Sequence, residues 1–119
     1  MTTATTPKTR TITLSNRPPV KIREDEWPQI AQASWTDNPA IPVQANRTAA
    51  VRVRQHADGR AIVYGTYSTQ WQGETDLKSG MLLAKGADIA AAIYEVVDDL
   101  GVTVTMAAEC VANLPAEEI

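Results

Sequence analysis

The sequence predicts an α+β fold, with a small antiparallel sheet, a central hairpin at about residues 49–67 and two to three helices packed on one face. Three observations predict it: a turn dipeptide between two β-prone runs, an amphipathic segment at 88–100, and strand-like segments that precede the helical ones. The 119 residues fit a single domain over 11–119, preceded by a flexible Thr-rich tail over 1–10.

The first folded segments are expected to be short strands. Polar and apolar residues alternate over 11–14, and a second extended run at 20–22 follows the rigid Arg17-Pro18-Pro19. A helix is then predicted over 26–34, because Asp25 can cap it, its first turn tolerates proline, and apolar residues recur at helical spacing, namely Trp27, Ile30 and Ala31. A loop and an extended segment at 43–45 lead into the hairpin.

The hairpin carries the strongest local pattern in the chain. Asp58-Gly59 is typical of a tight type I′ turn, in which both central residues need positive φ. Pairing Ala57 with Arg60 then places one apolar set on the buried face, consisting of Val51, Val53, Ile62 and Tyr64. The other face would be open to solvent and would carry Arg52, Arg54 and His56.

The C-terminal part predicts two helices after a polar loop and a short strand. The loop spans 68–79 and contains Trp71, and the strand is expected at 81–83. Asp88 caps the best helix, 88–100, in which Ile89, Ile93, Val96, Val97 and Leu100 form one stripe at about 100° per residue. A last helix is predicted to open at Thr105 and to end at Pro115.

Motifs for catalysis, metals and cofactors are missing from the sequence. With one histidine and one cysteine, His56 and Cys110, neither a disulfide nor a zinc ribbon can form, and no phosphate-binding loop or zinc-protease motif is present. A catalytic triad would have to use His56, beside a turn that supplies no orienting partner. We therefore expect a non-enzymatic protein without cofactor or metal. No apolar stretch predicts a signal peptide or a membrane span, so we expect a cytoplasmic protein.

Charge is distributed unevenly along the chain. Residues 1–72 carry a balance of +4 and residues 73–119 a balance of −7, which together give the net charge of −3. Arginines gather around the hairpin, whereas carboxylates populate the two C-terminal helices. Asp98 and Asp99 occupy the last turn of their helix, where the helix macrodipole disfavours negative charge, and such a locally unfavourable choice can indicate function.

Two binding functions follow from this charge map. In the first, Glu95, Asp98 and Asp99 contact a basic protein or ribonucleoprotein surface, and the hairpin arginines add a second contact. In the second, the protein is a nucleic-acid-binding module that uses Arg52, Arg54 and Arg60 on phosphates and His56 or Trp71 for stacking on bases. Against each stands a purely structural interpretation, in which the arginine row is a solvated sheet face and the aspartates are merely tolerated. A homodimer that joins sheet edges is a third alternative.

Several stretches resemble small uncharacterised proteins of proteobacterial chromosomes, phages and conjugative elements: NRPPVKI, DEWPQIA, VRVRQHADGRAIVYG, WQGE and LPAEEI. Small acidic or bipolar proteins of such elements often inhibit host defence, including anti-CRISPR and antirestriction proteins. The resemblance thus implies an accessory protein of a mobile element that binds and inhibits a host defence complex. It assigns no catalytic or binding residue.

Overall fold

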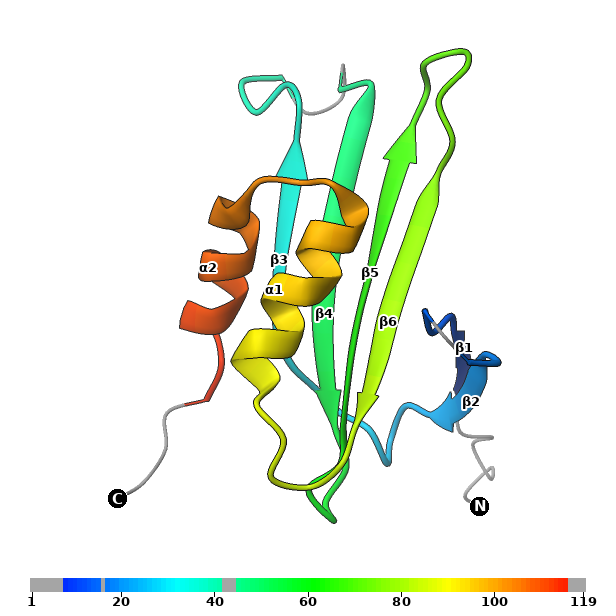
Figure 1. Cartoon of the computed structure of the whole chain (residues 1–119), viewed down its shortest axis with the longest axis vertical. Coiled ribbons are helices and arrows are strands. Elements are labelled where there is room, and N and C mark those ends of the chain that lie inside the picture. Colours follow the sequence, from blue (N-terminus) through cyan, green and yellow to red (C-terminus); the bar gives the residue numbers. More distant parts are fainter. Residues whose placement is uncertain (1–7, 16, 42–44, 116–119) are drawn as a thin grey trace, which may run out of the picture.

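The fold is α+β, as the sequence predicts. The computed structural model describes residues 8–15, 17–41 and 45–115 (Figure 1). In chain order its elements are β1 (Thr9–Ile12), β2 (Val20–Arg23), β3 (Gln29–Thr36), β4 (Arg47–Gln55), β5 (Ala61–Thr69), β6 (Leu77–Leu83), α1 (Ile89–Leu100) and α2 (Val104–Ala112). The expected tail over 1–10 falls mainly on residues 1–7, which lie outside the described residues, and Thr9 and Arg10 belong to β1.

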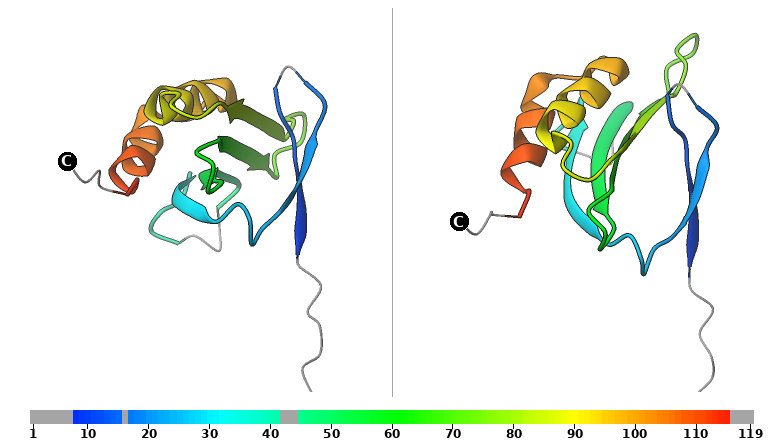
Figure 2. Two further views of the ribbon diagram at one scale, coloured as in Figure 1. Left: turned by 90° about the horizontal axis from the view of Figure 1, so that it is seen from below. Right: turned by 60° about the horizontal axis from the view of Figure 1, so that its bottom comes forward.

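The structure has three layers around a four-stranded antiparallel sheet in the order β3-β4-β5-β6. Helices α1 and α2 cover one face of the sheet, called here the helix face. The antiparallel pair β1-β2, called here the ribbon, lies against the opposite or outer face (Figure 2). Each face of the sheet therefore has its own apolar cluster beneath its cover.

The predicted helix at 26–34 is wrong: most of this segment is strand β3. Ala31 and Ala33 are buried on the helix face, while the residues between and after them, Gln32 and Ser34, are exposed. Alanine favours helices, and a register shift at Ile30 breaks the period-two alternation, so the local pattern resembles a helix. Pairing with β4 overrides this local preference.

The hairpin exists as predicted, but its predicted register is wrong by one residue. Gln55 pairs with Ala61, and the His56 N–H donates to the carbonyl of Arg60 (2.9 Å), so the connection is the three-residue loop 57–59. Only Gly59 in this loop has positive φ (+99°). The Gly59 N–H donates to the carbonyl of His56 (2.9 Å), and the Asp58 carboxylate accepts from the Arg60 N–H (2.9 Å). This is the geometry of a type I turn followed by a glycine bulge, not of a type I′ turn.

The shift changes which side chains share a face of the sheet. Val51 and Val53 lie with Ala61 and Val63 on the helix face, whereas Ile62 and Tyr64 lie on the outer face with Arg52 and Arg54. The expected open arginine face is therefore wrong in part, because Ile62 and Tyr64 are covered by the ribbon. Their buried neighbours from the N-terminal segment are Ile12, Leu14, Ile22 and Trp27.

The C-terminal elements follow the prediction closely. The Asp88 side chain accepts from the Ala91 N–H (3.1 Å) at the start of α1, and Gly101 ends the helix with φ of +70°. Helix α2 begins one residue before the expected Thr105 and is capped by Thr103. Strands β5 and β6 extend into the predicted loop 68–79 and leave residues 70–76 between them. The extended segment expected at 43–45 lies mostly outside the described residues.

Candidate functional site

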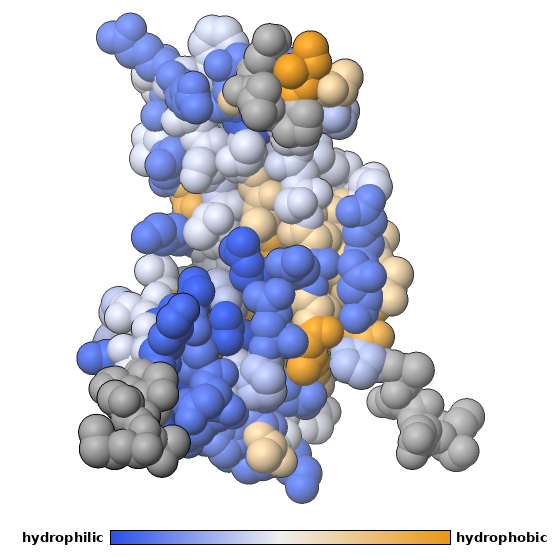
Figure 3. Space-filling model, turned by 180° about the vertical axis from the view of Figure 1, so that it is seen from behind, coloured by the Kyte–Doolittle hydropathy of each residue, from blue (hydrophilic) through white to orange (hydrophobic). Residues whose placement is uncertain are grey.

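The ribbon divides the outer face of the sheet into a closed half and an open half. Seen from behind, strongly hydrophilic residues gather over the lower half, where the ribbon crosses the sheet (Figure 3). Beyond the ribbon, the outer positions of the sheet carry small hydroxyl side chains, among them Ser34, Thr48 and Ser68, all exposed. The division decides which of the predicted arginines can reach a partner.

Arg54 lies in the closed half and is only 8% exposed. Its Nε donates to the Tyr64 hydroxyl (2.9 Å) and its Nη1 to the carbonyl of Trp27 (3.0 Å). The Glu24 carboxylate lies 3.8 Å from Nη2. Sequence reasoning placed Arg54 on an open face, and that placement is wrong, because the guanidinium joins the ribbon segment to the sheet.

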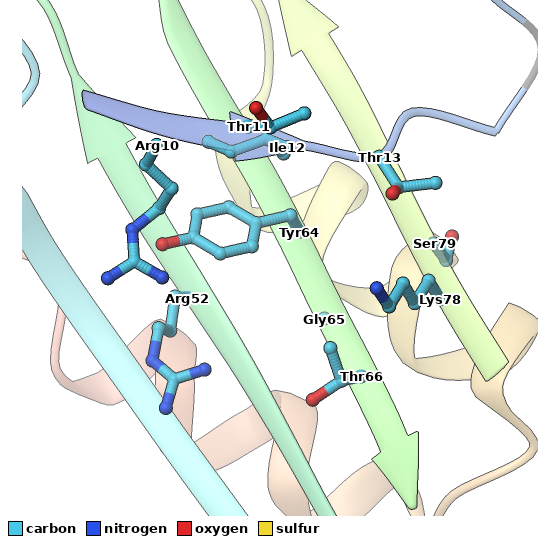
Figure 4. Close-up of a pocket in the computed structure, with 10 residues that line it drawn as sticks. All are labelled: Arg10, Thr11, Ile12, Thr13, Arg52, Tyr64, Gly65, Thr66, Lys78 and Ser79. Carbon is cyan, nitrogen blue, oxygen red and sulfur yellow. The ribbon is translucent and has the colours of Figure 1, made fainter. Parts of the chain in front are cut away.

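Arg52 lies in the open half, at the edge of a recess between β1 and the sheet (Figure 4). The recess has a volume of about 180 Å³. Three cationic side chains from three strands line it, namely Arg10 of β1, Arg52 of β4 and Lys78 of β6. Hydroxyl groups fill much of the remaining wall, and none of the residues that line the recess carries a carboxylate. A recess with this lining is suited to an anionic group.

Arg10 is held in place at the recess by Glu24. The Arg10 Nε donates to Glu24 Oε1 (2.8 Å), and this hydrogen bond raises the pKa of Arg10 and lowers the pKa of Glu24. Arg52 and Lys78 have no ion-pair partner among the described residues. Their charges are therefore available to a ligand.

His56 and Arg60 lie at the hairpin turn, outside the recess. The His56 Nδ1 accepts from the Asp58 N–H (3.1 Å), and its ring stands 5.0 Å from that of Trp27. The Arg60 guanidinium lies over the Trp27 ring (5.1 Å) and its Nε donates to Asp58 (2.8 Å). Both side chains thus pack around Trp27.

Trp71 lies at the opposite end of the sheet from His56, in the segment that follows β5. With a rise of about 3.3 Å per residue, the nine residues of β5 separate the two aromatic side chains by roughly 30 Å. Trp71 is 50% exposed and stacks under the guanidinium of Arg47 (5.5 Å), which also pairs with Glu74 (2.6 Å). The predicted set Arg52, Arg54, His56, Arg60 and Trp71 is therefore spread over four places: the recess, the closed half, the hairpin turn and the opposite end of the sheet.

The three predicted acidic residues do lie together on α1. Glu95, Asp98 and Asp99, called here the acidic patch, are exposed, and none of them forms an ion pair within the described part of the chain. Asp99 has a structural partner, since it accepts a hydrogen bond from the hydroxyl of buried Ser79 (2.9 Å). Arg17 lines a hollow of about 200 Å³ together with Glu95 and Asp99.

Neither a cluster of metal-ligating side chains nor an exposed cysteine occurs in the described ranges. There, no three His, Cys, Asp or Glu side chains are grouped so that they could hold a metal ion. Cys110 is fully buried, and burial raises the pKa of its thiol to about 11. None of the helices in the described ranges is both long and apolar enough to span a bilayer.

Sequence reasoning missed Arg10 and Lys78 as companions of Arg52. Arg10 was expected in a flexible tail and Lys78 in a loop, and only the packing of the ribbon across the sheet brings them together. The positive balance of residues 1–72 is a sequence signal for Arg10 and Arg52, whereas Lys78 lies in the acidic part of the chain, 73–119.

Comparisons of the chain with protein-family models, with curated proteins and with solved structures find no match.

Proposed function

We propose that this chain is a non-enzymatic protein that binds a macromolecular partner, and that the acidic patch of α1 contacts a basic surface of that partner. The observation that carries the proposal is the state of the three carboxylates. They are exposed on one helix and lack ion-pair partners in the described chain, while five arginines elsewhere, Arg10, Arg23, Arg47, Arg54 and Arg60, are paired with carboxylates.

The position of the patch adds to this argument. Asp98 and Asp99 lie at the C-terminal end of α1, where the helix dipole carries partial negative charge. Each exposed carboxylate there lowers helix stability by about 0.3–1 kcal/mol. The hydrogen bond from Ser79 offers a local reason for Asp99, whereas Glu95 and Asp98 have no such partner among the described residues. Electrostatic attraction to a cationic partner would explain these two residues.

The partner that fits this chemistry is a protein, or a ribonucleoprotein complex, with an exposed basic surface. The resemblance to proteins of mobile elements leads to a narrower hypothesis, in which the partner is a host defence complex that the protein inhibits. That role stays a prediction, and the experiment below identifies the partner without assuming it.

The test is an affinity pull-down of the tagged full chain from bacterial lysate, with and without nuclease, with mass spectrometry of the bound proteins. We expect a stoichiometric protein complex that survives nuclease. Binding of that complex is then measured for two matched charge reversals, Asp98→Lys on the patch and Glu109→Lys on the exposed side of α2. Asp99 is left intact because it bonds to Ser79.

The proposal expects Asp98→Lys to weaken binding at least about tenfold and Glu109→Lys to leave it nearly unchanged, since only the former lies on the acidic patch. Equal affinities for the two variants would remove the patch from the account. Recovery of nucleic acid alone, lost after nuclease treatment, would contradict the proposal as a whole.

A further inference from the structure

The recess on the outer face offers donors and positive charge, and none of the residues that line it carries a carboxylate. Two of the cations that line it, Arg52 and Lys78, have no ion-pair partner in the described chain, and Arg10 uses its Nε on Glu24. The Tyr64 hydroxyl accepts from Arg54, which leaves its own proton to donate. In Figure 4 the guanidinium of Arg10 and the hydroxyl of Tyr64 lie side by side at the recess.

The size of the recess limits what it can hold. Sites for cofactors and drug-sized ligands measure about 300–1,000 Å³, whereas this recess measures about 180 Å³. It therefore suits one small anionic group better than a whole cofactor. Guanidinium groups form paired hydrogen bonds with phosphate oxygens, and a lysine ammonium adds a point charge.

We propose that the recess binds one phosphate group of a single nucleic-acid strand, held by Arg10, Arg52 and Lys78. This site differs from the arginine set expected from the sequence, of which only Arg52 takes part. Arg54 is buried beneath the ribbon, and Arg60 pairs with Asp58 at the hairpin turn.

The surroundings of the recess favour a strand over an isolated phosphate ion. Beyond the recess the outer face continues as an exposed row of hydroxyl side chains, Ser34, Thr48 and Ser68, which can bond to sugar and phosphate oxygens. On the other side, the ribbon adds Lys21, which is exposed and pairs with Thr11 at the recess. An extended polyanion can use all of these groups, whereas a free ion reaches the recess alone.

The recess lies on the outer face and the acidic patch on α1, and they meet only at Ser79, which lines the recess and donates its hydroxyl to Asp99 (2.9 Å). The variants used to test the two proposals leave Ser79 and Asp99 intact. A partner that contains both basic protein and exposed nucleic acid could therefore contact both. Binding of the oligonucleotide at the recess and binding of the basic partner at the acidic patch are measured separately, so one proposal can fail without the other.

The experiment titrates the full chain with a short fluorescent single-stranded oligonucleotide at several salt concentrations. The recess variant is Arg52→Gln with Lys78→Gln. Its matched control is Arg60→Gln with Lys85→Gln at the hairpin turn, which removes the same charge outside the recess. Circular dichroism verifies that both variants stay folded. Parallel titrations of the ¹⁵N-labelled protein with inorganic phosphate and with the oligonucleotide test whether the recess binds a free phosphate ion or a phosphate group of a strand.

The expected result is that the recess variant binds the oligonucleotide at least about tenfold more weakly, whereas the control stays within about twofold. The slope of log affinity against log salt should fall by about 0.7 for the recess variant, the contribution of one phosphate on a single strand. Equal weakening of both variants, or no binding by the wild-type chain, overturns the proposal. Amide shifts around the recess with inorganic phosphate but not with the oligonucleotide overturn the assignment to nucleic acid.

Discussion

Replacing Arg54 by alanine should destabilise the fold strongly, although sequence reasoning placed this residue on a solvated surface. The substitution removes two hydrogen bonds from a buried charged donor, to the Tyr64 hydroxyl (2.9 Å) and to the carbonyl of Trp27 (3.0 Å). Hydrogen bonds that involve a charged group contribute roughly 1.5–3 kcal/mol each, so the expected loss is about 3–6 kcal/mol. For a domain of this size that corresponds to a drop in Tm of roughly 12–24 °C.

The assay is urea unfolding of Arg54→Ala beside Arg52→Ala. The two residues lie on the same strand and the same face. Among the described residues, however, Arg52 has no ion-pair partner, and its loss should change stability by no more than about 0.5 kcal/mol. A loss below about 1 kcal/mol for Arg54→Ala, similar to that for Arg52→Ala, would refute the argument that the ribbon seals this half of the sheet.

Three further predictions concern the ribbon, the thiol and the carboxylates. Gly80→Ala should lower the free energy of unfolding in urea by about 1–3 kcal/mol, because a Cβ there would collide with the carbonyl of Thr13. An unchanged unfolding midpoint would contradict the close approach of the N-terminal segment to β6. Cys110 should react with a thiol reagent at pH 8 only after unfolding, because burial raises the pKa of its thiol to about 11. Since the unfolded thiol loses its proton at lower pH than the folded one, stability should also fall as the pH rises from about 9 to 11. Rapid labelling of the native protein would contradict the burial. Hydrogen bonds from arginine residues lower the folded-state pKa of three carboxyl groups, those of Glu24, Asp58 and Glu74. Because this stabilisation is lost when the carboxylates are protonated, thermal unfolding from pH 7 to 3 should show stability falling below about pH 4.5. A flat profile would contradict these hydrogen bonds.

The sequence predicted correctly those elements that begin and end at characteristic capping or turn residues. Helix α1 has its N-cap at Asp88, its stop at Gly101 and a continuous apolar stripe, and the structure confirms all three. The hairpin was likewise predicted from its turn residues. Its register was not, because the choice between a type I′ turn and a bulged three-residue loop depends on how Asp58 bonds to the Arg60 N–H.

The remaining differences come from contacts between distant segments. Strand β3 contains alanines that favour a helix, and only its pairing with β4 makes it extended. The ribbon covers the outer face because the one-residue shift places Ile62 and Tyr64 there, and this cover separates Arg54 from Arg52. The acidic patch was predictable from helical spacing alone, whereas the recess required Arg10, Arg52 and Lys78 from three distant strands.

The most direct test of the account concerns the division of the outer face into a closed half and an open half. In a ¹H–¹⁵N spectrum, the Nε–H of each arginine gives its own signal, and its rate of exchange with water reports its protection. We expect slow exchange for Arg54, whose Nε donates to buried Tyr64, and fast exchange for Arg52 at the recess. Equal and fast exchange for both arginines would contradict the closed half, and protection of Arg52 would contradict the open recess.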